Sequence, residues 1–96
     1  MKIVWSPRAI AHLVAIRALI AADSPDAAQA VAAKIIASVE QLALYPNRGR
    51  AGRVPGTREL VIAGTAYVLP YRVKAERLEI VALFHGRQHW PEAFSS

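Results

Sequence analysis

The sequence predicts one α+β domain over residues 1–96, ordered β-α-α-β-β-β, with a helical hairpin packed on one face of a small, mainly antiparallel sheet. Apolar residues recur at helical spacing through the first half of the chain and alternate with polar residues through the second half. The period changes at an arginine-rich segment, residues 46–60. A chain of 96 residues that is 54% hydrophobic fits a single domain with its own core.

Residues 2–5 (KIVW) form a short β-like run, which we expect to join the sheet, and two helices follow. Ser6 can cap the first helix and Pro7 suits its first position, and Ser24 and Pro25 repeat this pattern. A short link between two helices predicts an antiparallel hairpin. The residues expected in the core or at its edge are Trp5, Leu13, Ile16, Ile20, Val31, Ile35, Val39, Leu42 and Tyr45.

Three consecutive antiparallel strands are predicted in the second half, at residues 57–63, 67–73 and 78–84. Their alternation puts one apolar set in each strand toward the core, including Leu60, Ile62, Tyr67, Leu69, Tyr71, Val73, Leu78, Ile80, Ala82 and Phe84. Pro70 cannot donate a hydrogen bond to a strand ladder. It therefore predicts a bulge, or an N–H side that faces away from a partner strand.

The segment PNRGRAGRVPGTREL, residues 46–60, holds four arginines before its first acid, Glu59. Its glycines and prolines predict an irregular loop. Unpaired arginines repel one another, so we expect these side chains to contact nucleic-acid phosphates, a nucleoprotein or the carboxylates of a protein partner. A solvated turn is the alternative. The four arginines are Arg48, Arg50, Arg53 and Arg58.

Composition narrows the class of protein. The net charge of +5 indicates an acidic partner, and the excess of cations lies in the second half of the chain. The absence of cysteine excludes disulfides and a thiol nucleophile, and no metal or cofactor motif is present. Every apolar run looks too short to span a bilayer and the N-terminus does not resemble a signal peptide. We therefore expect a cytoplasmic protein without a membrane partner.

Several motifs in a fixed order carry a resemblance to a known family: WSPRA, DSPDAA, LALYPNRGRAGRVPGTRELVI, YVLPYRV and IVALFHGRQHWP. Together they resemble the RelE/ParE superfamily of toxins from bacterial type II toxin–antitoxin systems, over nearly the whole chain. The resemblance implies a small basic toxin that a cognate antitoxin of the ParD or RelB type wraps and neutralises.

The superfamily divides by target, and the resemblance favours one branch. RelE-like members are ribosome-dependent endoribonucleases that cut mRNA, whereas ParE-like members poison DNA gyrase. Positions that are basic in RelE-like enzymes fall here on Glu59, Val61 and Val68, and the basic C-terminal position falls near Arg87 or Gln88. The resemblance therefore implies a ParE-like gyrase inhibitor that arrests growth and stabilises plasmids. Its target-binding residues are expected among Arg48, Arg50, Arg53, Arg58, Arg72, Arg87 and Trp90.

Two alternatives remain open. An mRNA endoribonuclease needs an acid, a base and a cationic clamp around the phosphate. His85 or His89 could serve as acid or base, with Arg58, Arg72 and Arg87 as the clamp. These histidines could equally have no catalytic role, with His85 at the end of a strand and His89 in a solvated tail. No catalytic residue is therefore assigned. The second alternative is a degenerate, non-toxic partner that only binds an antitoxin.

Apolar side chains left over on the hairpin predict the antitoxin site. Ile10, Val14 and Ile36, with Arg17 beside them, can form a groove for an antitoxin helix. An open sheet edge could also accept an antitoxin strand.

Overall fold

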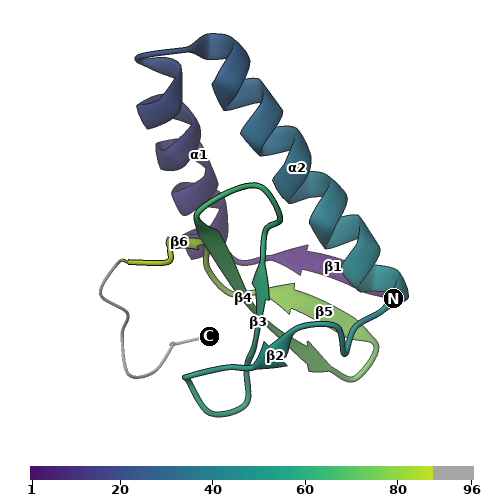
Figure 1. Ribbon diagram of the computed structural model, residues 1–96. Helices are drawn as coiled ribbons and strands as arrows, with labels where there is room; N and C mark the ends of the chain where they lie inside the picture. The colour runs from purple at the N-terminus through teal and green to yellow at the C-terminus, as the bar shows by residue number, and fades with distance from the viewer. Residues whose placement is uncertain (88–96) are drawn as a thin grey trace.

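The computed structural model describes residues 1–87 and confirms the predicted α+β order (Figure 1). Two short strands, β2 and β6, add to the predicted elements. The bounds are β1 Lys2–Trp5, α1 Pro7–Ala21, α2 Pro25–Leu44, β2 Arg50–Ala51, β3 Arg58–Val61, β4 Tyr67–Lys74, β5 Arg77–Ile80 and β6 Phe84–His85.

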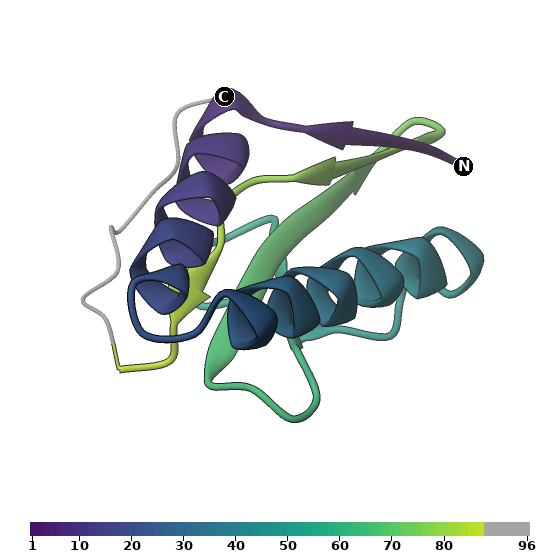
Figure 2. The same cartoon turned by 90° about the horizontal axis from the view of Figure 1, so that it is seen from above.

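Both helices begin where the capping residues predict. The hydroxyl oxygen of Ser6 accepts a hydrogen bond from the Ala9 N–H at 3.0 Å, and that of Ser24 accepts one from the Ala27 N–H at 3.2 Å. Each cap satisfies a backbone donor that has no partner within the helix. The two helices lie side by side and cover one face of the sheet (Figures 1 and 2).

The core lies between α2 and the sheet. Ile35, Val39 and Leu42 of α2 pack on buried strand residues, and α1 adds the fully buried Ala9. The strand residues of this core are Ile62, Leu69, Tyr71, Leu78 and Ile80. Tyr45 is an exception to the predicted set, because it caps the C-terminus of α2 and is 60% exposed.

Helix α2 also corrects an expectation about membranes. By length and composition alone, its 20 residues could cross a bilayer. The expectation that every apolar run is too short to do so is therefore wrong for this helix. The same helix supplies three of the buried core side chains, as a core helix of a globular domain does. Most of its apolar stretch nevertheless stays exposed.

The strands of the sheet lie in the order β1-β5-β4-β3-β2, and β6 pairs with β4 beyond the end of β5. The pairing of β1 with β5 is parallel and the other pairings are antiparallel. The start of the chain therefore lies against residues 77–80, close to the end of the described part.

The single strand predicted over residues 78–84 is wrong, because the chain is interrupted after Ile80. Along β4 the partners move three residues, from Tyr71 to Val68, while the opposite chain moves four, from Ile80 to Phe84. One extra residue has the effect of a bulge and exchanges the two faces. Leu83 therefore enters the main core, while Ala82 and Phe84, expected there, pack with Val68 and Val81 in a second cluster.

Pro70 explains where the ladder between β4 and β5 ends. Its carbonyl accepts the Val81 N–H at 3.0 Å, but the reciprocal bond would need an N–H that proline lacks. The Val81 carbonyl instead accepts a hydrogen bond from the Ser6 hydroxyl at 2.8 Å. Of the two predictions for Pro70, the bulge agrees with the extra residue opposite it, whereas its nitrogen side faces Val81 and not away from a partner. Ser6 satisfies the carbonyl that Pro70 leaves without a donor.

Candidate functional site

The arginine loop, residues 46–57, is anchored at its start by Tyr71. The buried Tyr71 hydroxyl donates to the Pro46 carbonyl at 2.7 Å and accepts the Gly49 N–H at 2.8 Å. A Cβ on Gly49 would lie 2.6 Å from the Tyr71 ring, so only glycine fits this approach. Arg50–Ala51 then pair with β3 as strand β2, which corrects the expectation of an irregular loop throughout.

The far end of the loop closes through a second set of backbone bonds. The Gly52 N–H donates to the Thr57 carbonyl at 2.8 Å, and the Thr57 N–H donates to the Val54 carbonyl at 3.2 Å. Gly56 adopts the left-handed region with φ of 81°, which glycine occupies without strain. The loop is therefore held in one conformation at both ends.

Glu59 supplies a counter-charge for two of the arginines. Its carboxylate is 3% exposed and accepts the Arg53 N–H at 2.7 Å, the Arg53 Nε at 3.2 Å and the Arg50 Nη2 at 3.2 Å. Burial alone would raise the pKa of Glu59, but these bonds from Arg53 and Arg50 outweigh it and lower the pKa below its ordinary value. The expectation that the loop arginines lack a counter-charge is wrong for this pair.

Arg58 holds the loop from the other strand. Its Nη1 donates to the carbonyl of Gly49 at 2.8 Å and to that of Asn47 at 3.3 Å. Arg48 is exposed and lines a shallow cavity between α2 and β3. Arg58 is thus committed to loop structure, while Arg48 faces the solvent.

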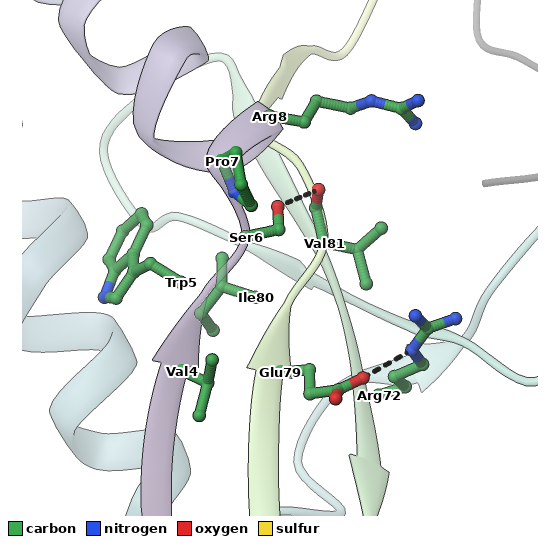
Figure 3. Close-up of a pocket in the computed structure, with 9 residues that line it drawn as sticks. All are labelled: Val4, Trp5, Ser6, Pro7, Arg8, Arg72, Glu79, Ile80 and Val81. Carbon is green, nitrogen blue, oxygen red and sulfur yellow. Dashed lines mark hydrogen bonds and ion pairs between the residues drawn. The ribbon is translucent and has the colours of Figure 1, made fainter. Parts of the chain in front are cut away.

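Arg72 lies on the sheet face away from the hairpin. Its Nε donates to Glu79 Oε1 at 2.7 Å, and Arg77 binds the other oxygen of that carboxylate at 3.2 Å. The bonds from Arg72 and then Arg77 lower the pKa of Glu79. Arg72 and Glu79 line a cleft of about 360 Å³ together with Arg8, Val4 and Val81 (Figure 3).

The structure does not gather the predicted nuclease groups into one site. Arg58 of β3 pairs with Tyr71 of β4, so the two side chains lie on the same face of the sheet. Arg72 follows Tyr71 in β4 and therefore points to the opposite face. His85 pairs with Tyr67, five residues before Arg72 on β4, which is about 17 Å along a strand. The Arg87 N–H donates to His85 Nδ1 at 3.2 Å. His89 and Trp90 lie outside the described residues.

The three sheet positions that are basic in RelE-like enzymes are occupied here by one acidic and two apolar residues. Glu59 is neutralised by two arginines, Val61 is 52% exposed and Val68 is buried in the second cluster. Within residues 1–87, no group of three metal-binding side chains is placed to hold an ion.

The apolar residues that the sequence predicts for an antitoxin groove are exposed on the hairpin. Ile10 is 50% exposed, Val14 63% and Ile36 42%, and Arg17 is exposed on the same stripe of α1 as Ile10 and Val14. Leu19, which is 71% exposed, was not predicted.

Two further residues have roles that sequence reasoning missed. His12 Nδ1 accepts the Leu83 N–H at 3.1 Å, and its ring lies 5.1 Å from that of Phe84, so His12 ties α1 to the interrupted strand. No local pattern around His12 signals this. Glu59 carried a weak signal, because it is the first acid after four arginines.

Fold and surfaces together define a small basic toxin of the RelE/ParE superfamily. Residues 3–90 match the family described as ParE toxin of type II toxin–antitoxin system, parDE. The chain belongs to this family.

Known relatives agree with this assignment. The chain is 45% identical to Y4kP of Sinorhizobium fredii, described as a candidate toxin, over 95% of this chain and 94% of that protein. It is 40% identical to Toxin RelE2 of Caulobacter vibrioides, over 88% of this chain and 94% of the relative. The structure of a chromosomal ParDE system from P. aeruginosa matches with a TM-score of 0.79 and 27% identity, covering 88% of this chain and 95% of that one.

Proposed function

We propose that this toxin inhibits DNA gyrase and is neutralised by a ParD-like antitoxin. One observation carries the choice of target. In a chain of the ParE family, the groups that could cleave RNA are divided between the two faces of the sheet, with Arg58 and Arg72 on opposite sides. Gyrase inhibition in the cytoplasm would arrest growth and, from a plasmid-borne module, would stabilise the plasmid.

The antitoxin is the partner that a type II toxin implies. We propose that an antitoxin helix covers Ile10, Val14 and Ile36, because these apolar side chains are exposed on adjacent helices. Arg17 could pair with an antitoxin carboxylate at the border of this contact.

Induced expression of the toxin in a bacterial host, with pulse labelling of DNA and protein synthesis, tests the target. We expect DNA synthesis to stop first, and purified toxin to block supercoiling by purified gyrase. Early arrest of translation, with DNA synthesis continuing, would contradict gyrase as the target. Harmless expression of folded protein would support a non-toxic antitoxin-binding partner instead.

An mRNA endoribonuclease is the second candidate, because the chain is 40% identical to Toxin RelE2. Incubation with ribosomes and a defined mRNA tests it directly. Cleavage that is lost in His85→Ala and Arg72→Ala would favour this function. Intact mRNA under the same conditions would exclude this endoribonuclease activity.

A further inference from the structure

His12 of α1 contacts the break in the sheet between β5 and β6, and Figures 1 and 2 show β6 beside this helix. The break consists of residues 81–83, called here the connector. The His12 Nδ1 atom accepts the N–H of Leu83 at 3.1 Å. Leu83 is only 2% exposed and belongs to the main core, where a backbone N–H needs an acceptor. The imidazole therefore takes the place of a strand partner.

The connector is held at both of its ends. At its start, the Val81 N–H donates to the Pro70 carbonyl at 3.0 Å, and the Val81 carbonyl accepts the Ser6 hydroxyl at 2.8 Å. At its end, Leu83 is held by His12. Neither a carbonyl nor a serine hydroxyl changes its charge near neutral pH, whereas an imidazole does. The bond to His12 is therefore the one of these three that a change of pH can break.

This bond exists only with a neutral ring. An imidazole nitrogen accepts a hydrogen bond while it carries no proton, and in the imidazolium ion both ring nitrogens are donors. Protonation of Nδ1 would thus direct its N–H at the N–H of Leu83. Of the two arginines of α1, Arg8 lies one turn before His12, whereas Arg17 lies about 140° around the helix. Burial, and then the charge of Arg8, lower the pKa of His12 below its ordinary value of 6.5, so the folded protein favours the neutral ring.

The charged and titratable groups on the chain segment that packs against His12 lie at and after the end of β6. Within the described residues they are His85 and Arg87, and the Arg87 N–H donates to His85 Nδ1 at 3.2 Å. The His85 ring packs edge-on against that of Tyr67, with centroids 5.7 Å apart, whereas the His12 ring lies 5.1 Å from that of Phe84. Phe84 and His85 are successive strand residues and point to opposite sides. The two imidazoles therefore lie in separate surroundings.

We propose that His12 is a pH-sensitive latch between α1 and the connector. While the ring is neutral, it holds Leu83 at the helix, and once it is protonated, the connector and Phe84 come away from α1. The chain continues into β6, so the latch sets how firmly that strand is held. Ile10 and Val14 each lie two positions from His12, about 160° around the helix. The latch thus acts on the side of α1 away from the proposed antitoxin contact, and it does not depend on the target of the toxin.

NMR spectroscopy of the whole toxin between about pH 5 and pH 8 tests the latch. The Cε1 proton of His12 and the amide proton of Leu83 should shift with one common midpoint, below the ordinary value of 6.5. Amide exchange at Leu83, corrected for the intrinsic effect of pH, should become about tenfold faster or more as His12 is protonated. A Leu83 amide that keeps its shift while His12 titrates would overturn the proposal.

Stability provides a second measurement. A ring that folding keeps neutral stabilises the protein in full above the ordinary pKa of 6.5, and this contribution falls between that value and the lower pKa of the folded protein. The thermal midpoint of the unmodified toxin should therefore drop by about 4 °C or more from about pH 7.5 to about pH 5.5. His12→Asn carries an amide oxygen in place of Nδ1 and no titrating group, so its midpoint should drop by less than about half as much.

His85→Asn is the matched control, because it removes the other imidazole of the described residues, whose ring contacts Tyr67 of β4. Its midpoint should drop with pH as much as that of the unmodified toxin. Equal drops in the two asparagine variants would contradict the latch. If His12→Asn does not fold, the NMR titration of the unmodified toxin decides alone.

Discussion

Glu59 is a buried acid whose charged partners are themselves exposed. Its side chain is 3% exposed, whereas those of Arg50 and Arg53 are 60% and 45% exposed. Taking a carboxylate out of water is unfavourable unless it is paired and hydrogen-bonded. The backbone N–H of Arg53 and two guanidinium groups meet this need, so one carboxylate fixes the position of two loop arginines.

Glu59→Gln should lower the free energy of unfolding by about 2 kcal/mol at neutral pH, because charge-assisted bonds are lost in a buried position. Glu79→Gln is the control and should cost less than about 1 kcal/mol, since the Glu79 side chain is 19% exposed, more than that of Glu59, and loses less when its charge is removed. Chemical denaturation of the two variants and the unmodified protein measures both effects. Equal costs would contradict a special role for Glu59.

The contribution of Glu59 to stability should depend on pH, because the pKa of its carboxyl is lowered in the folded protein. The folded pKa of Glu59 lies below its ordinary value of 4.5, so its stabilisation is present in full above that value and is lost as the pH falls through the folded pKa. The stability difference between the unmodified protein and Glu59→Gln should therefore shrink under acidic conditions. A difference that stays constant as the pH falls would show that charge is not its source.

At the scale of elements, Ser6 serves two structures at once. It caps α1 through Ala9 and also donates to Val81, the carbonyl opposite Pro70. Ser24 caps α2 in the same way, but its hydroxyl makes no second bond among the described residues. The two serines therefore separate the effect of a helix cap from that of the interrupted strand.

Ser24→Ala should cost about 1 kcal/mol, as loss of an N-cap does. Ser6→Ala should cost about 2 kcal/mol, because it also leaves the Val81 carbonyl without its donor. Equilibrium denaturation compares the two, and Ser6→Thr should recover most of the loss by restoring a hydroxyl. If both alanine variants lose the same stability, the bond to Val81 contributes nothing.

Local signals were enough to predict the helix starts and the disturbance at Pro70. Caps act within a few residues, so Ser6 and Ser24 could be read directly from the sequence. The extra residue between Ile80 and Phe84 depends on how two separate strands pair, and this is why Ala82 and Phe84 were assigned to the wrong face.

The sequence was enough to locate the arginine-rich loop, but not to predict the contacts that hold it. The arginine-rich loop stands out by composition, whereas the burial of Glu59 and the Tyr71 hydroxyl bond appear only once residues 46–57 fold back over β3 and β4. The neighbouring cations on the sheet face away from the hairpin could not be predicted for the same reason. Lys2 and Arg77 are far apart in the chain, and only the parallel pairing of β1 with β5 makes them neighbours.

At the scale of the whole molecule, two surfaces of different chemistry lie on opposite sides of the sheet. The hairpin side exposes apolar residues, and the sheet face away from the hairpin exposes the cations Lys2, Lys74 and Arg77. Substitutions on one side should therefore leave binding on the other side unchanged.

Ile10→Glu or Val14→Glu should weaken antitoxin binding by about tenfold or more, because a charge would enter an apolar contact. Stability should stay close to that of the unmodified toxin, since both side chains are exposed in the folded protein. Leu19→Glu is the control: it lies nine residues from Ile10, on the opposite side of α1. Calorimetric titration with the antitoxin measures this, and an equal loss in the Leu19 variant would contradict the site.

The parallel pairing of β1 with β5 also bears on how the toxin is made. β1 is synthesised long before residues 77–80, the strand with which it pairs, and Ser6 before Val81, whose carbonyl accepts its hydrogen bond. Such distant contacts form only when the intervening chain exists. A translation product that stops before residue 77 lacks β5, the strand with which β1 pairs. The sheet of this toxin therefore takes its final form only after residues 77–80 have been synthesised.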